Sequence, residues 1–364
     1  MSPLLAATLA HLTALVAYDT RNPPRAIGAG GIFTYLRGEL PGFDVTVTDH
    51  GAGSVSLLAV RGQPDVLFNV HLDTVPASSQ WSADPFALRI THERAIGLGA
   101  CDIKGAAAAL LAASQASRGA LGLLLTSDEE GATPRCVREF LARHPAIKQV
   151  VVAEPTRCHA VLAHRGIVSA RVRFAGHAGH ASAVQQRGDS AVHQAVRWGA
   201  AALAYAAAQD AATFGGLRGL RCNLGRIEGG IKANMIAGEA EVQAGLRPLP
   251  ATDVDALLAR LRELADPAPA EFIETFRGAP LPANPVAASE QLDAARALAT
   301  RYGMPVGEAV DFWTEAALFS AAGCTTFVFG PGDIAQAHSA DEWVALAELE
   351  RAAQTYRNLL EHAS

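Results

Sequence analysis

The sequence predicts an α/β protein in which one domain is interrupted by a smaller inserted domain. Strand-like and helix-like runs alternate over residues 1–164, which is typical of a mostly parallel central sheet flanked by helices. Over residues 165–277 the pattern changes to four strands and two helices, which favours an α+β unit with an antiparallel sheet. The first pattern returns over 278–364, so we expect residues 1–164 and 278–364 to form one domain.

Each predicted element of the first segment follows from its local pattern. Apolar residues at helical spacing between Leu4 and Val16 predict an amphipathic first helix. The run Gly28–Gly31 follows no clear strand and is interpreted as a flexible turn. Short apolar runs predict strands at 45–49, 55–61, 66–70, 122–127 and 150–153, and longer runs predict helices at 105–117 and 137–144.

The remaining elements divide between the inserted domain and the closing segment. In the inserted domain we expect strands at 167–174, 220–227, 239–246 and 271–276 and helices at 189–209 and 252–264. The closing segment is predicted to hold a helix at 289–302, a strand at 325–329 and a final helix.

Composition and charge exclude several classes of protein. The chain of 364 residues is 50% hydrophobic and 18% charged, which is enough to bury a large core. A net charge of −6 offers no basic surface for phosphates, so nucleic acid is not an expected partner. The 5 cysteines are scattered without a Cys-x-x-Cys pair, which fits a reducing compartment. Because no stretch is apolar enough to span a bilayer, we expect a cytoplasmic protein with no membrane partner.

Polar side chains follow the predicted strands where each strand ends. His71 and Asp73 follow one strand, Glu129 and Glu130 follow the next, and Glu154 follows a third. Ligand sites in open α/β sheets lie beyond the carboxyl ends of the strands, so these groups are expected to converge. Asp102, just before a helix, and His338, in a loop near the end of the chain, add two further polar groups.

Imidazoles and carboxylates without thiolates suit a catalytic metal site that holds Zn²⁺, Mn²⁺ or Co²⁺. A carboxylate can bridge two ions through its two oxygens, and one of two adjacent glutamates can bind metal while the other takes a proton. Each feature also has a simpler interpretation, because Asp-Glu-Glu is common in solvated turns and His338 could be a surface residue.

Seven segments together resemble one family. They are HLDTVP (71–76), GLGACDIKG (97–105), SDEEG (127–131), AEPT (153–156), GHAGHAS (176–182), GRIEGGIKANMIA (225–237) and AHSADE (337–342). In this order they resemble the metallohydrolase family of acetylornithine deacetylase, succinyl-diaminopimelate desuccinylase, aminoacylase and glutamate carboxypeptidase. The resemblance implies that residues 1–164 and 278–364 are a catalytic metal-binding domain. It also implies that residues 165–277 are a lid and dimerisation domain, so a homodimer is expected.

The resemblance also implies roles for particular residues. One metal ion, Zn²⁺ or Co²⁺, would be held by His71, Asp102 and Glu154, and a second by Asp102, Glu130 and His338. Glu129 would be the general base, Asp73 would orient His71, and His180 would stabilise the oxyanion. Asn234 and Arg247 match substrate-binding positions, and Arg247 could equally be a strand-end arginine in an exposed salt bridge.

Further segments narrow the expected substrate to a small N-acetylated amino acid. AYDTRNPPRA (17–26), HRGI (164–167), FWTEAALFSAAG (312–323) and FGPGDIAQAHSADEW (329–343) resemble the branch of the family that deacetylates N-acetyl-L-citrulline in arginine biosynthesis. Arg165 and Asp341 stand where family members often have Lys and Asn. Acetylornithine deacetylase, a related dipeptidase or carboxypeptidase, and a catalytically silent binding protein are the alternatives.

Overall fold

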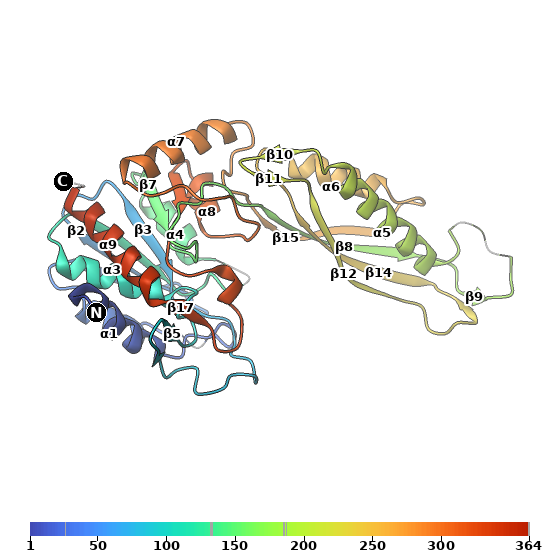
Figure 1. Cartoon of the computed structure of the whole chain (residues 1–364). Helices are drawn as coiled ribbons and strands as arrows, with labels where there is room; N and C mark the ends of the chain where they lie inside the picture. Colours follow the sequence, from blue (N-terminus) through green and yellow to red (C-terminus); the bar gives the residue numbers. More distant parts are fainter. Residues whose placement is uncertain (26, 132–133, 185, 187, 363–364) are drawn as a thin grey trace. The chain divides into compact units, whose positions relative to one another are not determined.

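The computed structural model describes residues 1–25, 27–131, 134–184, 186 and 188–362 (Figure 1). The chain divides into two compact units. Unit 1 comprises residues 1–162, 293–308 and 314–364, and unit 2 comprises residues 163–292 and 309–313. Unit 2 therefore contains the whole predicted inserted segment, residues 165–277, and also residues 278–292, which we had expected in the first domain.

Unit 1 is built on a six-stranded sheet in the order β1-β2-β6-β3-β7-β16. The strands are β1 (Asp44–Asp49), β2 (Val55–Arg61), β3 (Leu67–His71), β6 (Leu121–Thr126), β7 (Gln149–Val152) and β16 (Thr325–Val328). Strands β6, β3, β7 and β16 are parallel, whereas β2 runs antiparallel to both of its neighbours. Every residue of β3 and β6 is buried, as expected for strands covered on both faces. The predicted fold class is confirmed.

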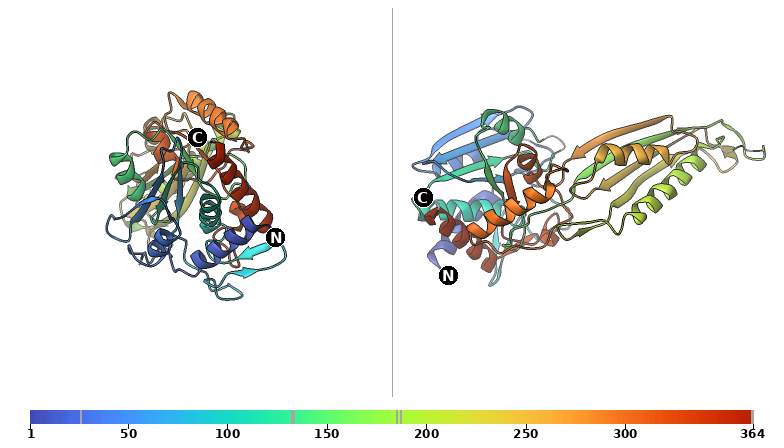
Figure 2. Two further views of the ribbon diagram at one scale, coloured as in Figure 1. Left: turned by 90° about the vertical axis from the view of Figure 1, so that its left-hand side faces the viewer. Right: turned by 90° about the horizontal axis from the view of Figure 1, so that it is seen from above.

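Helices cover both faces of this sheet (Figure 2). On one face α1 (Pro3–Val16), α3 (Lys104–Ala116) and α9 (Leu346–His362) pack together, and on the other α4 (Cys136–Arg143) packs with α8 (Ala316–Ala321). The alanine-rich α3 is buried from Lys104 to Ser114, since its small side chains let α1 and α9 approach closely. α7 (Ala288–Arg301) follows the inserted segment.

Several short elements were not predicted. α2 (Ile32–Gly38) begins directly after the predicted turn at Gly28–Gly31 and buries Ile32, Phe33 and Leu36. A small sheet of β17 (Trp343–Ala345), β5 (Arg94–Ile96) and β4 (Arg89–Ile90) joins distant parts of the chain, and η1 (Ile334–Gln336) is a single 3₁₀ turn. Such short pieces carry too little local pattern to be recognised.

Unit 2 is an antiparallel sheet in the order β12-β14-β8-β15 with two helices. The strands are β12 (Arg221–Gly229), β14 (Glu239–Arg247), β8 (Ile167–Ala175) and β15 (Glu271–Gly278), and the helices are α5 (Ala191–Ala208) and α6 (Val254–Glu263). The core between sheet and helices centres on Trp198, whose Nε1 donates to the Leu261 carbonyl at 2.9 Å. This agrees with the predicted α+β composition.

Two two-stranded pairs complete unit 2. They are β10 (Thr213–Phe214) with β11 (Leu217–Arg218), and β9 (Gly179–His180) with β13 (Met235–Ile236). Within the described ranges of both units, no helix is long and apolar enough to cross a membrane.

Candidate metal centre

Three adjacent strands of unit 1 bring the predicted ligands to one edge of the sheet. His71 ends β3 and lies opposite Thr126, the last residue of parallel β6. Glu154 lies two residues beyond β7, which is also parallel to β3. Because neighbouring parallel strands end at the same edge, the side chains that follow them converge.

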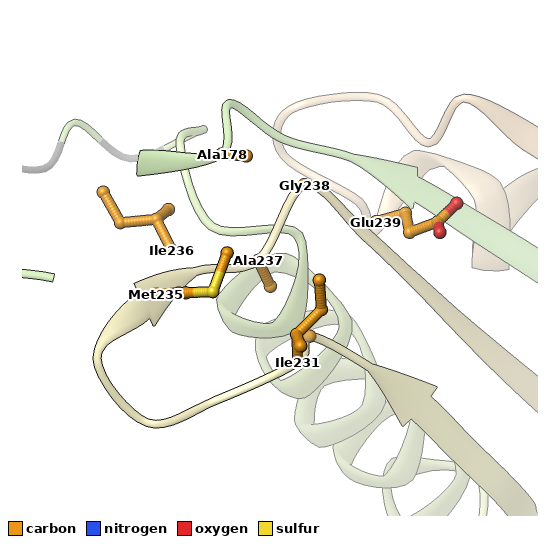
Figure 3. Close-up of a pocket in the computed structure, with 8 residues that line it drawn as sticks. Ala178, Ile231, Met235, Ile236, Ala237, Gly238 and Glu239 are labelled. Carbon is orange, nitrogen blue, oxygen red and sulfur yellow. The ribbon is translucent and has the colours of Figure 1, made fainter. Parts of the chain in front are cut away.

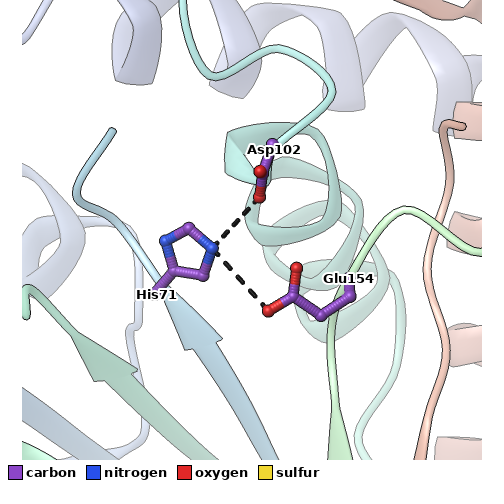
Figure 4. Close-up of side chains that lie close together, drawn as sticks. All are labelled: His71, Asp102 and Glu154. Atoms are coloured by element: carbon purple, nitrogen blue, oxygen red, sulfur yellow. Dashed lines mark hydrogen bonds and ion pairs between the residues drawn. The ribbon is translucent and has the colours of Figure 1, made fainter. Parts of the chain in front are cut away.

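The first cluster contains His71, Asp102 and Glu154 (Figure 4). His71 Nε2 lies 3.1 Å from Asp102 Oδ1 and 3.8 Å from Glu154 Oε1. All three side chains are buried, at 2%, 6% and 4% exposure. They offer one imidazole nitrogen and two carboxylates around a common point.

The second cluster contains Asp102, Glu130 and His338. His338 Nε2 lies 3.2 Å from Asp102 Oδ2 and 3.0 Å from Glu130 Oε1. Asp102 therefore faces one cluster with Oδ1 and the other with Oδ2. This arrangement is what a bridging carboxylate requires.

The charges of these groups fit a pair of divalent cations. Burial first, and then the charges of neighbouring carboxylates, raise the pKa of Glu154 well above its usual value despite the opposing effect of His71. Burial also opposes ionisation of Asp102, but hydrogen bonds with His338 and His71 outweigh it and lower its pKa. Crowded, buried carboxylates are stabilised by cations, and imidazole with carboxylate is a donor set that Zn²⁺ and Co²⁺ accept.

Asp73 links His71 to the turn that follows β6. His71 Nδ1 lies 2.9 Å from the Asp73 backbone carbonyl, with the Asp73 carboxylate farther away at 3.5 Å. The carboxylate instead accepts hydrogen bonds from the backbone N–H groups of Glu129, at 3.3 Å, and Glu130, at 3.0 Å. The contact nearest to the imidazole is thus made by the main chain of Asp73, while its side chain holds the neighbouring turn.

Glu129 belongs to neither cluster, although it is next to Glu130 in the chain. Burial is the largest of the effects that raise the pKa of Glu129 well above its usual value. The negative charges of Glu130, Glu315 and Asp73 raise it further, and His71 acts in the opposite direction. A carboxylate with a raised pKa is suited to hold a proton near neutral pH.

Glu342 is a site residue that pattern analysis did not identify. It is 2% exposed, and its Oε1 accepts from the backbone N–H groups of Cys101, at 2.8 Å, and Asp102, at 2.9 Å. Its Oε2 accepts from Gly99 N–H at 3.0 Å. Glu342 therefore fixes the loop that carries Asp102. Its place in the AHSADE segment was the available signal.

Asp341 anchors the loop that carries His338. Its Oδ1 accepts from Ser82 Oγ at 2.9 Å and from Arg89 Nη2 at 2.6 Å. Its backbone is left-handed, with φ 54°. Asp and Asn tolerate that conformation better than most residues, so either fits the turn.

His180 and Asn234 lie on paired segments of unit 2. His180 in β9 is opposite Met235 in β13, and Ala181 N–H donates to the Asn234 carbonyl at 3.0 Å. His180 is exposed, and its Nδ1 lies 2.7 Å from Ser182 Oγ. A pocket of ≈ 250 Å³ adjoins β13, and Figure 3 shows its lining, which includes Ile231, Met235, Ile236 and Glu239.

Arg247 ends β14 in unit 2, opposite Arg221. Its side chain is half-buried, and burial lowers its pKa against the effect of Asp311. Among the residues that the structure describes, the Arg247 guanidinium has no salt-bridge partner within 4 Å. The buried Arg165 pairs with Asp311 and donates to the carbonyls of Gly219 and Arg218, both at 2.6 Å.

The model of the peptidase family M20/M25/M40 matches residues 67–362. The chain belongs to this family.

This M20 member is 60% identical over 362 residues to N-acetyl-L-citrulline deacetylase of Xanthomonas campestris pv. campestris, covering 99% of each chain. It is 32% identical to acetylornithine deacetylase of Vibrio vulnificus over 84% of this chain and 83% of that protein.

Among solved structures, YXEP of Bacillus subtilis, described as a dinuclear metal binding peptidase from the M20 family, superposes with a TM-score of 0.68 at 15% identity. That match covers 98% of each chain. The protein is therefore a metal-dependent hydrolase of the M20 family.

Proposed function

We propose that this M20 member hydrolyses the acetyl amide of N-acetyl-L-citrulline to L-citrulline and acetate, as a step of arginine biosynthesis. The observation that carries this proposal is 60% identity over 99% of both chains to a protein of that activity. The acetylornithine deacetylases of Vibrio vulnificus and Myxococcus xanthus match at 32% identity, which makes acetylornithine the alternative substrate. A dipeptidase or carboxypeptidase activity is the second alternative within the family.

The proposed metal ligands are the members of the two clusters. His71, Asp102 and Glu154 would hold one ion, and Asp102, Glu130 and His338 a second. We propose Zn²⁺ or Co²⁺, because the donors are imidazole and carboxylate without thiolate. When bound, the ions would acidify a water molecule and polarise the acetyl carbonyl.

The proposed proton carrier is Glu129. Its carboxylate takes a proton from the attacking water as the oxygen bonds to the acetyl carbon, and returns one to the nitrogen as the carbon–nitrogen bond breaks. Its raised pKa supports this role, since a stronger base accepts the proton more readily. Asp73 would keep Glu129 and Glu130 in place through its hydrogen bonds to their backbone N–H groups.

Unit 2 would supply the groups that recognise the substrate. We propose that the exposed imidazole of His180 donates to the oxyanion and that Asn234 contacts the substrate. The half-buried guanidinium of Arg247 would bind both oxygens of the substrate carboxylate. Its lack of a salt bridge among the described residues supports this role.

We further propose that residues 165–277 act as a lid and dimerisation domain. β12 pairs only with β14 in the described sheet, and its residues 225–229 are all exposed. Ile227 on this edge and Val196 and Leu203 on the adjacent α5 are 49%, 56% and 45% exposed. An open strand edge beside exposed apolar side chains favours pairing with a second copy about a twofold axis. Light scattering should give a dimer mass, and Ile227→Lys should give a monomer.

We place the enzyme in the cytoplasm, because all five cysteines are free and four of them are buried. A small N-acetylated amino acid is its proposed partner molecule.

The experiment that tests the proposed function measures amine release from N-acetylcitrulline and N-acetylornithine by metal-stripped enzyme, with and without added Co²⁺ or Zn²⁺. We expect metal-dependent hydrolysis that favours acetylcitrulline. Glu129→Gln should lower turnover about 10²- to 10⁴-fold. Glu139→Gln, on the exposed face of α4, is the matched control and should keep full activity. Preference for acetylornithine would correct the substrate, and turnover in Glu129→Gln equal to wild type would exclude Glu129 as the base.

A further inference from the structure

The segment between α1 and α2 has no part in the proposed mechanism, yet it is bonded to the loop that follows His71. Arg21 and Thr74 form a parallel β-bridge. In this bridge Thr74 N–H donates to the Thr20 carbonyl at 3.0 Å, and Asn22 N–H donates to the Thr74 carbonyl at 2.8 Å. The buried Thr20 hydroxyl also donates to the Leu72 carbonyl at 2.7 Å. The segment is therefore fixed along one side of the candidate metal centre.

Asn22 makes a direct contact with Asp73. The Asn22 side chain is 5% exposed, and its Nδ2 donates to Asp73 Oδ2 at 2.8 Å. The same carboxylate oxygen accepts from Glu130 N–H at 3.0 Å. Arg25 Nε donates to Asn22 Oδ1 at 3.1 Å, which turns the amide so that its NH₂ group faces Asp73.

Two glycines leave room for this arrangement. A Cβ atom on Gly131 would overlap the Arg25 guanidinium and lie 2.8 Å from Asn22 Nδ2. A Cβ atom on Gly53 would overlap the side chain and carbonyl of Arg25. Gly131 directly follows Glu129 and Glu130, so the absence of a side chain there lets Asn22 and Arg25 lie against the turn that carries both glutamates.

We propose that Asn22, oriented by Arg25, is a positioning residue for the metal centre that acts through Asp73. The carboxylate of Asp73 has oxygens toward the Glu129 and Glu130 N–H groups and lies 3.5 Å from His71 Nδ1. Asn22 supplies the side-chain donor that holds this carboxylate in one orientation. Without it, Oδ2 loses a partner inside the protein, and both the imidazole and the glutamate turn lose a fixed neighbour. The inference rests on the metal centre of the proposed function, but not on its substrate.

Co²⁺ titration of the metal-free full-length protein, followed by visible absorption, tests this proposal. Asn22→Leu keeps a branched side chain of similar size but removes the donor. Loss of a residue that orients metal ligands typically lowers affinity by about 10- to 100-fold. We therefore expect Asn22→Leu to weaken Co²⁺ binding about 10-fold and to change the absorption spectrum.

The matched control is Thr20→Val, which removes another buried hydrogen bond between the same two segments without touching Asp73. We expect it to lower the melting temperature but to leave Co²⁺ affinity within about twofold and the spectrum unchanged. Gly131→Ala should reproduce the Asn22→Leu spectrum, because the added methyl displaces Asn22 and Arg25.

A double-mutant cycle checks that the effect passes through Asp73. In an Asp73→Ala background, Asn22→Leu should change Co²⁺ affinity less than twofold. Wild-type affinity in Asn22→Leu, or equal losses in Asn22→Leu and Thr20→Val, would overturn the positioning role. Failure of the wild-type protein to bind Co²⁺ would instead overturn the proposed metal centre.

Discussion

Replacement of Glu342 tests how the loop that carries Asp102 is held. Its carboxylate accepts three backbone hydrogen bonds, from Gly99, Cys101 and Asp102, at 2.8–3.0 Å. A buried donor left without a partner costs roughly 1–3 kcal/mol. Glu342→Ala leaves three such donors, but water entering the vacated space recovers part of the loss. We expect Glu342→Ala to lower the free energy of unfolding of the metal-free protein by about 3–5 kcal/mol.

Glu342→Gln separates the three hydrogen bonds. The amide oxygen can still accept from Cys101 and Asp102, but the NH₂ group then faces Gly99 N–H. One hydrogen bond is lost, so the expected cost is about 1–3 kcal/mol. Burial raises the pKa of Glu342 to about 7, and the comparison is therefore made at pH 8, where the carboxylate is ionised.

Urea unfolding followed by tryptophan fluorescence measures these changes. Trp343 adjoins Glu342 in the chain and has Arg94 Cζ 3.9 Å from its ring centroid, so it reports locally. Asp341→Asn is the control, because Asn fits the left-handed backbone at this position, and it should cost less because the Asp341 carboxylate is half-buried and its bonds compete with water. Unfolding of Glu342→Ala at the wild-type urea concentration, or an equal cost in Glu342→Gln and Glu342→Ala, would show that these three hydrogen bonds do not stabilise the loop.

Three further predictions follow from the same geometry. Asp102→Asn should reduce the binding of both metal ions, whereas Glu154→Gln should reduce the binding of one ion only. The metal content of each variant after dialysis measures this. One ion retained in Asp102→Asn would contradict a bridging role for Asp102. Burial, and then the charge of Asp128, raises the pKa of Glu315 from 4.5 to about 8, so folding favours its protonated form. As the pH rises from 4.5 to 8, the free energy of unfolding of the wild type should therefore fall relative to that of Glu315→Gln, by up to about 1.4 kcal/mol per pH unit. The same pH dependence of the free energy of unfolding in both proteins would contradict this. Trp198→Phe leaves the Leu261 carbonyl without its indole donor and should cost roughly 1–3 kcal/mol in urea unfolding, whereas an unchanged midpoint would assign no energy to this bond.

The long helices and strands were predicted well, because the hydrophobic pattern that marks each of them lies within the helix or strand itself. The helix expected at 105–117 is α3 at Lys104–Ala116, and the strand expected at 239–246 is β14 at Glu239–Arg247. β14 alternates between buried and more exposed residues, and α3 is mostly a long, continuously buried run of small apolar residues. Elements of two or three residues, such as β5 and β17, could not be predicted, because pairing with distant strands is what makes them extended.

The candidate site divides in the same way. His71 and Glu154 were predicted to converge because parallel strands end at one edge of a sheet, and the structure brings them together with Asp102. The AHSADE segment marked the position of Glu342, but local pattern could not show which groups it bonds, because its three donors lie about 240 residues earlier in the chain. The sequence pattern also could not show that Asp73 contacts His71 mainly through its backbone carbonyl. The Asp73 carboxylate instead accepts a hydrogen bond from the backbone N–H of Glu130.

The sequence by itself determined the α/β class, the inserted α+β unit and the residue types able to bind metal, since each depends on local periodicity or on side-chain chemistry. Only the tertiary structure decided the strand order, the sharing of Asp102 between two clusters, and the contacts of Asn22 and Glu342 with the ligand loops. These features are set by hydrogen bonds between backbone and side-chain groups far apart in the chain, and such bonds leave no periodic pattern in the sequence.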